Sequence, residues 1–244
     1  MSETAVTLTA HQALLRPVRA GNTFEQAVER ILSMIKLGVV DVGERLPSER
    51  ELAARLGVGR SAVRGAVRAL QDAGFVESRR GRYGGTFALA APATRRRRDP
   101  RLVARALSGD LEDALSFRMV VEVGAAEVAA GRRLTSAEVA HLEQMLEQAA
   151  TASYADYRRA DSRLHLAIAE LSGSTSVTAA VADARMRINA LLDVIPLLGQ
   201  NIANSDDQHA AVVAAVLGGR PTKARRAMTE HVEGTASLLR AFLD

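Results

Sequence analysis

The chain has 244 residues and a formal net charge of +4; it is 48% hydrophobic and only 3% aromatic, with no cysteine. This length holds two modest domains, and a core poor in aromatic residues favours packed helices over a β-sandwich. The composition excludes disulfides and thiolate metal sites. No apolar run approaches the ~18 residues of a membrane span, so we expect a cytoplasmic protein without a signal peptide.

The charge is divided unevenly along the chain. Residues 1–98 carry 17 Lys and Arg against 9 Asp and Glu, whereas residues 99–244 carry 15 against 19. A basic first part predicts a polyanionic partner, because cationic side chains neutralise phosphates and release counterions. The acidic second part argues against a nucleic acid that binds along the whole molecule.

Residues 1–20 lack clear periodicity, which predicts an N-terminal arm. Apolar residues at helical spacing then predict a helix from residue 24 to 35. Ser48 and Glu51 have the spacing of a capping box at the start of a second helix, and Gly57 suits its end. A third helix is expected from about residue 60 to 73.

Two alternating segments, 75–78 and 86–89, flank a glycine-rich basic tip and predict a β-hairpin. Three helices followed by this hairpin are typical of a winged helix-turn-helix, which we place at residues 21–90. Two prolines and four consecutive arginines predict a linker at residues 91–100.

From residue 101 to 244 the pattern predicts only helices, so the expected fold class is mainly α. It combines the N-terminal winged helix-turn-helix with a C-terminal all-α helical bundle. The expected helices are 110–131, 136–151, 154–172, 175–198, 207–217 and 222–242.

Arginines cluster where a helix-turn-helix meets DNA. Arg60 and Arg64 lie one turn apart at the start of the third helix, and arginine can hold guanine O6 and N7 with two hydrogen bonds. Arg50 can reach the same groove or a phosphate, and Arg79 lies with other basic residues on the wing. The alternative is that these arginines only solvate an amphipathic helix. The predicted DNA-contacting residues are Arg50, Arg60, Ser61, Arg64, Arg80, Gly81 and Arg82.

Three histidines and one aspartate form a second candidate site. Asp161 and His165 are four residues apart on one expected helix, and His209 and His231 lie on two later ones. Three imidazoles and a carboxylate suit a divalent transition ion such as Zn²⁺, Ni²⁺, Mn²⁺ or Fe²⁺. The spacing alone fits surface or core histidines as well.

Residues 24–89 resemble the DNA-binding domain of the GntR family of bacterial regulators. The resemblance is carried by the uninterrupted motif Leu46-Pro47-Ser48-Glu49-Arg50-Glu51-Leu52-Ala53, by Arg60, Val63 and Arg64, and by Gly81 with Gly85-Thr86-Phe87. It implies DNA contacts from Arg50, Arg60, Arg64 and Gly81, and a homodimer on a palindromic operator. Gly59 and Gly65 depart from the family pattern, where Ser or Thr and Glu are usual.

Residues 101–242 resemble the all-helical FCD ligand-binding domain of FadR-type members. Its metal-binding branch carries Asp-x-x-x-His and two later histidines, which implies that Asp161, His165, His209 and His231 bind the ion. The resemblance also implies that Arg118 faces a cavity and holds an effector carboxylate; a structural bridge to Glu122 is the alternative. Arg185 and Arg187 match family arginines, but periodicity does not say which points inward. Ser174 departs from a usual Asn.

Together these features predict a metabolite-responsive transcriptional regulator, more specifically a repressor released by a small organic acid, with no catalytic residues. The partners expected are double-stranded DNA, the acid and a second copy of the chain, but no membrane. One rival is a metal-dependent enzyme acting on a small organic acid, with Glu230 or Asp207 as general base. Another is a nonspecific DNA-compacting protein.

Overall fold

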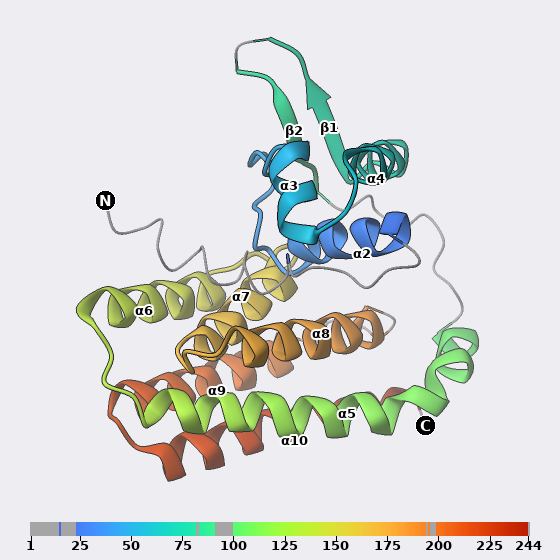
Figure 1. Cartoon of the computed structure of the whole chain (residues 1–244). Coiled ribbons are helices and arrows are strands. Elements are labelled where there is room, and N and C mark those ends of the chain that lie inside the picture. The colour runs from blue at the N-terminus through green and yellow to red at the C-terminus, as the bar shows by residue number, and fades with distance from the viewer. Residues whose placement is uncertain are drawn as a thin grey trace. The chain divides into compact units, whose positions relative to one another are not determined.

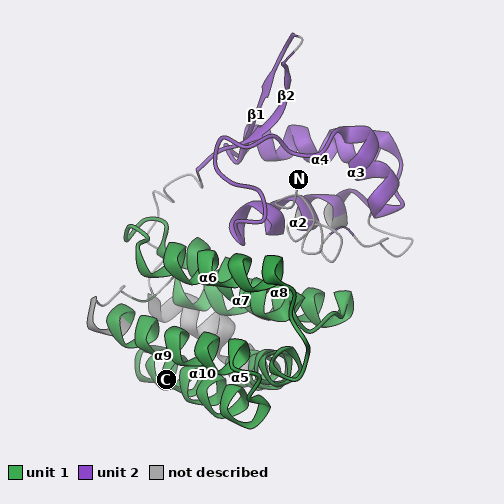
Figure 2. Cartoon of the chain, turned by 90° about the vertical axis from the view of Figure 1, so that its left-hand side faces the viewer, with its two compact units in different colours: residues 1–6, 95–244 green, residues 7–94 purple. Residues whose placement is uncertain are grey.

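The computed structural model describes residue 15 and residues 23–81, 83–90, 100–193, 195 and 199–243. The side chains of 25, 26, 29, 100–110, 199–201 and 244 are outside the description, as are Arg82, the rest of the predicted arm and residues 91–99 of the predicted linker. Two compact units contain the described residues, one within 7–94 and the other within 95–244 (Figure 2).

The first unit is a winged helix-turn-helix, as predicted. It contains α2 (Thr23–Lys36), α3 (Glu49–Leu56) and α4 (Arg60–Asp72), followed by the antiparallel strands β1 (Val76–Arg79) and β2 (Gly85–Ala88) (Figure 1). Each element turns an apolar face inward, because burial of apolar surface is the main favourable term in folding. Its buried core includes Ala27, Ile31, Met34, Leu52, Leu56, Val63, Ala66, Val67, Leu70, Val76 and Ala88.

Local sequence signals define the helix-turn-helix. The Ser48 hydroxyl accepts a hydrogen bond from the Glu51 N–H, and the Glu51 carboxylate accepts one from the Ser48 N–H at 2.9 Å. Gly57 ends α3 at a φ of +67°, a conformation that glycine adopts without steric cost. Gly59 is the N-cap residue of α4 and supplies no side-chain cap. The departure at Gly65 has a packing reason, since a Cβ there would lie 3.3 Å from the Phe24 ring.

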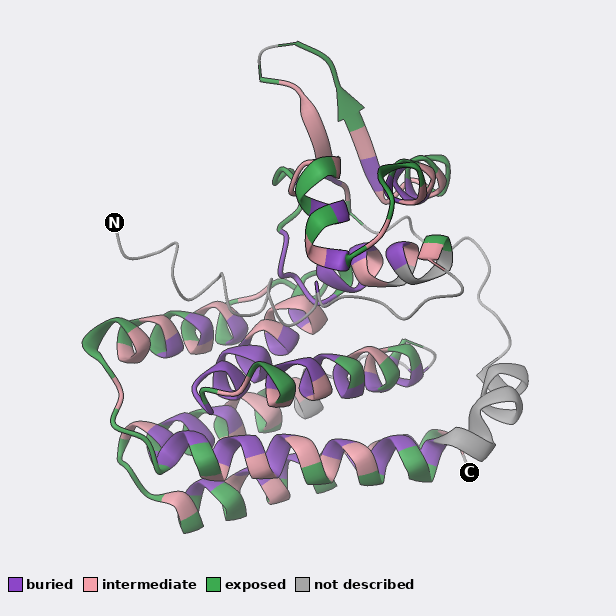
Figure 3. Ribbon diagram, in the orientation of Figure 1, coloured by how far each residue is buried: buried purple, intermediate pink, exposed green. Residues whose placement is uncertain are grey.

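The second unit is the predicted all-α bundle. Its helices are α5 (Pro100–Ala130), α6 (Ser136–Ala150), α7 (Tyr157–Glu170), α8 (Thr175–Leu192), α9 (Gly199–Leu217) and α10 (Pro221–Leu243). Figure 3 shows buried positions along the inward sides of these helices, with exposed positions on the outer sides. Ser174 caps α8 in place of the usual Asn, because its hydroxyl accepts from the Val177 N–H.

Two apolar clusters fill the bundle, and they meet along α5 and α10. One cluster contains Val123 of α5 and Val232 of α10, and the other contains Leu115 and Ala236 of the same two helices. The polar residues Arg118 and Glu122 lie between Leu115 and Val123 in sequence, His231 directly precedes Val232, and all three are buried. The bundle therefore buries polar side chains beside its two apolar clusters.

Three of the predicted helix boundaries are wrong. Helix α5 begins at Pro100 rather than residue 110, because proline suits the first position of a helix, where its missing N–H is no loss. Helix α8 ends at Leu192 rather than residue 198, and Pro196 follows, a residue type that cannot continue the hydrogen-bond ladder. Helix α9 begins at Gly199 rather than residue 207, so cap-forming residues such as Ser205 lie inside it.

No helix among the described ranges is both long and apolar enough to span a bilayer.

Candidate metal centre and DNA-contacting surface

The predicted base-reading residues are all exposed. Arg60, Ser61 and Arg64 lie in the first turns of α4, and Arg50 lies in α3. The opposite face of α4 is buried through Val63, Ala66, Val67 and Leu70. The fold thus leaves these four polar side chains available to a partner, as a recognition helix requires.

Glu49 holds Arg64 in a way that the sequence did not suggest. The Glu49 carboxylate lies 3.2 Å from Arg64 Nε, and the Arg64 side chain is 73% exposed. The two residues are 15 positions apart and belong to α3 and α4, so helical periodicity gives no signal for the pair. Because the contact uses Nε, it orients the guanidinium without engaging its Nη groups.

The wing presents Arg80 and Gly81 at its exposed tip. Gly81 has a φ of +105°, and its carbonyl accepts a hydrogen bond from the Gly84 N–H at 2.8 Å. Arg79 is instead used within the hairpin, since it pairs with Glu77 and its guanidinium lies 4.3 Å from the centre of the Phe87 ring. Of the wing arginines that the structure describes, Arg80 is the one that projects from the tip.

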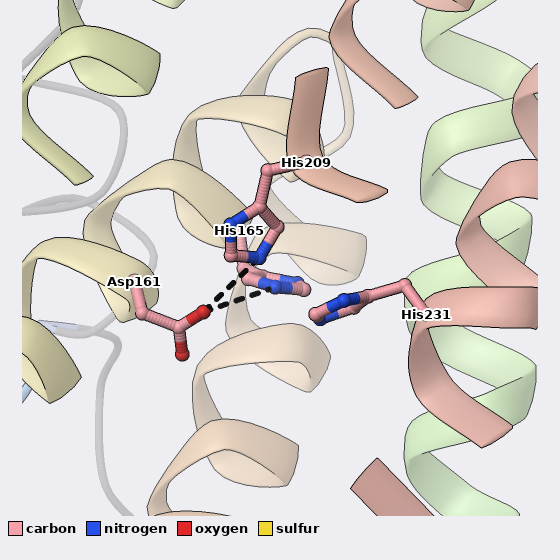
Figure 4. A group of neighbouring side chains, drawn as sticks. All are labelled: Asp161, His165, His209 and His231. Carbon is pink, nitrogen blue, oxygen red and sulfur yellow. Dashed lines mark ion pairs between the residues drawn. The ribbon is translucent and has the colours of Figure 1, made fainter. Parts of the chain in front are cut away.

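The predicted metal ligands come together in the helical unit. Asp161 and His165 of α7, His209 of α9 and His231 of α10 point toward one another (Figure 4), and one ligand atom of each lies within 4.8 Å of all the others. Opposite ligands of an octahedral ion are about 4.2 Å apart, at metal–nitrogen distances near 2.1 Å. The four side chains are therefore close to the spacing of a coordination shell.

Each imidazole also has an oxygen near Nδ1. His165 Nδ1 lies 2.7 Å from the Glu122 carboxylate, His209 Nδ1 lies 4.0 Å from that of Asp206, and His231 Nδ1 lies 3.1 Å from the Gln208 side-chain oxygen. The oxygens of Glu122 and Gln208 favour a proton on Nδ1 of His165 and His231, the usual outer arrangement of histidine ligands. The Asp206 oxygen is beyond hydrogen-bond distance of His209 Nδ1.

The inner nitrogens fit a cation. Among the described residues no hydrogen-bond partner is found for Nε2 of His165 or His209, although both are buried. These nitrogens lie 3.7 and 3.2 Å from Asp161 Oδ1. Electron-rich atoms that converge in a buried place are unfavourable unless a positive charge lies between them, so the donor set suits a divalent transition ion.

Burial keeps two of the imidazoles neutral. It lowers the pKa of His165 to about 4, despite the nearby carboxylate of Glu122. It also holds the pKa of His231 well below its usual range, helped by the two other imidazoles and by Arg118. Burial alone would raise the pKa of Asp161, but Arg185 and the histidines reverse this and hold it well below its usual value. Asp161, His165 and His231 are thus in the protonation states that metal binding requires.

Arginines surround the cluster, and the structure separates the inward from the outward ones. Arg118 is 1% exposed; its Nε lies 3.1 Å from Glu122, and its Nη2 lies 3.3 Å from His231 Nε2. Arg118 thus forms the structural bridge to Glu122 and also reaches the histidine cluster, and its Nη1 is buried with no hydrogen-bond partner in the described chain. Arg185 points inward and pairs with Asp161, whereas Arg187 lies outside and pairs with Asp113.

The candidate general bases of the enzyme alternative are not placed for such a role. Glu230 is exposed and lies 3.6 Å from Arg226, and Asp207 is exposed on α9. The neighbour Asp206 faces His209 instead, and Gln208 faces His231. Sequence reasoning missed these two residues; only the i, i+3 spacing of Asp206 and His209 could have pointed to one of them.

Comparisons with known proteins give the family. Residues 23–87 match the model of bacterial regulatory proteins of the gntR family, and residues 113–234 match the FCD domain. The chain belongs to the GntR family. It is a DNA-binding, metabolite-responsive transcriptional regulator rather than an enzyme.

Individual relatives match most of the chain. The putative L-lactate dehydrogenase operon regulatory protein of Escherichia coli is 28% identical over 89% of this chain and 86% of its own length. The transcriptional repressor NanR of Salmonella arizonae is 28% identical over 95% and 90%. A third relative matches over 65 residues, which are 27% of this chain and 24% of that relative's length.

A solved structure, that of E. coli McbR/YncC, is 17% identical with a TM-score of 0.54, and the match covers 90% of this chain and 97% of that protein. The likeness shows the fold.

Proposed function

We propose that this GntR-family chain is a cytoplasmic repressor that binds a palindromic operator as a homodimer and is released by a small carboxylate. The observation that carries the proposal is the buried Asp161–His165–His209–His231 cluster, placed in a chain that also has exposed arginines on a recognition helix. NanR, a relative over nearly the whole chain, is named a repressor.

DNA contact is proposed for Arg50, Arg60, Ser61, Arg64, Arg80, Gly81 and Arg82. The exposure of the six described residues supports this assignment, as does the ion pair that orients Arg64. Arginine at the start of a recognition helix reads guanine, while the wing contacts the minor groove or the backbone. A two-fold dimer would present two such surfaces to a palindrome.

The metal is proposed to be held by Asp161, His165, His209 and His231, with Zn²⁺, Ni²⁺, Mn²⁺ or Fe²⁺ as the candidates. When bound, such an ion supplies open coordination positions to an anionic ligand. Arg118 would hold the effector carboxylate through Nη1, the donor that has no hydrogen-bond partner in the described chain.

Charge supports an anionic effector. The buried groups Arg118, Arg185, Glu122 and Asp161 carry two positive and two negative charges, and the neutral imidazoles of His165 and His231 add none. A divalent ion would leave this buried site with an excess of positive charge, which is costly in a medium of low dielectric constant. An organic acid would offset that charge. The relative from E. coli is named for a lactate dehydrogenase operon, which agrees with a small acid.

Release would follow from a shift in population between two dimer geometries. An effector that binds one geometry more tightly changes the equilibrium by its differential affinity. The spacing of the two DNA-reading surfaces would then no longer match the two half-sites.

Footprinting of the full chain on promoter fragments near its own gene tests the proposal. We expect protection of a palindrome by the metal-loaded protein and loss of protection with one member of a panel of small organic acids. Absence of protection in every metal and acid condition would refute operator binding. Protection that no acid relieves would refute the effector.

A further inference from the structure

The two oxygens of Asp161 face different partners. Oδ1 lies 3.2 Å from His209 Nε2 and 3.7 Å from His165 Nε2. Oδ2 accepts a hydrogen bond from Nη2 of Arg185. Figure 4 shows the same division, with the ion pairs to both histidines drawn from one oxygen. The aspartate is therefore not a free carboxylate beside three imidazoles.

Arg185 is held firmly enough to maintain this division. It is 1% exposed, and Nη2 also lies 3.4 Å from Ser162 Oγ, while Nη1 lies 3.9 Å from Glu122 Oε1. Ser162 Oγ itself accepts from Asn189 Nδ2 at 2.9 Å and donates to the Arg158 carbonyl at 2.7 Å. The planar guanidinium has contacts on both Nη groups, so rotation away from Asp161 would break several of them.

The other buried arginine does not duplicate this role. Arg118 lies at hydrogen-bond distance from Glu122 and His231. Arg185 is the arginine, among those that the structure describes, that forms an ion pair with Asp161. Arg185 is therefore the arginine that engages Oδ2 of Asp161.

We infer that Arg185 is a positioning residue of the metal centre, which occupies Oδ2 of Asp161 so that this aspartate offers a single oxygen to the ion. The inference rests on the proposed metal site. A carboxylate that used both oxygens would take one more coordination position, so Arg185 keeps that position available to the effector.

The full chain loaded with Co²⁺ alone tests this role, because the intensity of cobalt visible bands falls as the coordination number rises. Arg185→Met removes the guanidinium and frees Oδ2. We expect this variant to retain cobalt and to show weaker visible bands than the wild type. Arg187→Met is the matched control: it lies on the same helix, its side chain is 54% exposed, and it contacts Asp113. Its spectrum should equal that of the wild type.

A wild-type spectrum in a cobalt-loaded Arg185→Met variant would overturn the inference. So would loss of cobalt from that variant in its folded form, since removal of Arg185 should free an oxygen and not remove a ligand.

A second measurement needs no arginine variant, so it tests the inference even when Arg185→Met does not fold. In metal-induced infrared difference spectra, a carboxylate bound through one oxygen has widely separated stretching bands, and one bound through two has closer bands. We expect the wide separation in the wild type, from bands that are absent in Asp161→Asn. Close bands would overturn the inference while leaving the metal site itself intact. A wild-type chain that takes up no cobalt would overturn the proposed metal site and the inference together.

Discussion

At the scale of single residues, side chains gain their roles from neighbours far away in the sequence. Arg64 is exposed in α4 and is oriented by Glu49 of α3. His231 of α10 contacts Arg118, which is 113 positions earlier. Both contacts orient a functional side chain. The sequence identifies the type of that side chain but not its orientation.

We expect Arg64→Ala to weaken operator binding by about 1–3 kcal/mol and to relax the preference for one base, because a bidentate arginine–guanine pair is removed. Binding titrations on the operator and on single-base variants measure this change. Arg225→Ala, an exposed arginine of the helical unit, is the control and should bind as the wild type does. Unchanged base preference in Arg64→Ala would show that Arg64 does not read a base.

We expect His209→Ala to lose bound metal and to lower the thermal stability of the metal-loaded protein. Metal that binds only the folded state adds about 2.7 kcal/mol of stability at a free concentration one hundred times its Kd. Elemental analysis and thermal unfolding, each with and without a chelator, give the two readouts. His141→Ala removes a half-buried histidine of α6 outside the cluster and is the matched control. Full metal occupancy in His209→Ala would exclude His209 as a ligand.

At the scale of secondary-structure elements, side-chain caps begin several of the helices whose starts were predicted correctly. Capping boxes begin α3 and α6, the latter through Thr135 and Glu138. The predicted start of α9 was wrong, and Ser205 and Asp206, residue types that are common at helix caps, lie inside the helix. Asp206 there faces His209. Tertiary packing therefore outweighs local preference in α9.

We expect Gly59→Ser to stabilise the protein by roughly 0.5–1 kcal/mol, since a serine there caps α4 and restricts the unfolded chain. The position accepts a side chain: φ is −65°, and a Cβ would approach only the Ser61 hydroxyl, at 3.5 Å. Urea unfolding measures the change. Gly57→Ser is the contrasting variant and should destabilise, because residue 57 has a φ of +67°. Equal effects at both positions would contradict this account of the turn.

The capping box of α6 gives a stability that depends on pH. The backbone N–H and the hydroxyl of Thr135, together with Arg132, lower the pKa of Glu138 below 4.5 against a smaller opposing effect of burial. A lowered carboxyl pKa adds stability above the unfolded-state value and loses it as the pH falls below about 4.5. Glu138→Gln keeps the hydrogen-bonding shape, so its destabilisation should be full at about pH 7 and smaller near pH 3. The unfolding free energies of the wild type and of Glu138→Gln, measured at the two pH values, test this expectation. An equal loss of stability at both pH values would contradict a role for the Glu138 charge.

At the scale of the whole molecule, positive charge is concentrated before residue 99, and the cluster of Asp161 with three histidines lies after it. The two units therefore have separate chemistry: one suits phosphates and base edges, and the other suits an ion with an organic acid. The family assignment, which rests on matches to both units, agrees with this division.

We expect operator affinity to fall steeply as salt concentration rises, because bound arginines release counterions from DNA. Arg80→Ala should weaken binding equally on all DNA sequences and reduce the slope of log K against log salt by about one, since one phosphate is no longer neutralised. Titrations at several salt concentrations measure the slope. An unchanged slope would remove Arg80 from the phosphate contacts, whereas a change in base preference would make it a reader.

Sequence patterns alone predicted the winged helix-turn-helix, the all-helical second unit and the four side chains that cluster in it. Caps, turns and helical periods act within a few residues, and the family motifs are contiguous or regularly spaced. Three-dimensional packing was needed to show that Arg185 points inward and Arg187 outward, that Glu49 pairs with Arg64, and that Gln208 contacts His231. These outcomes depend on which helices pack together, and packing brings together residues that no local spacing relates.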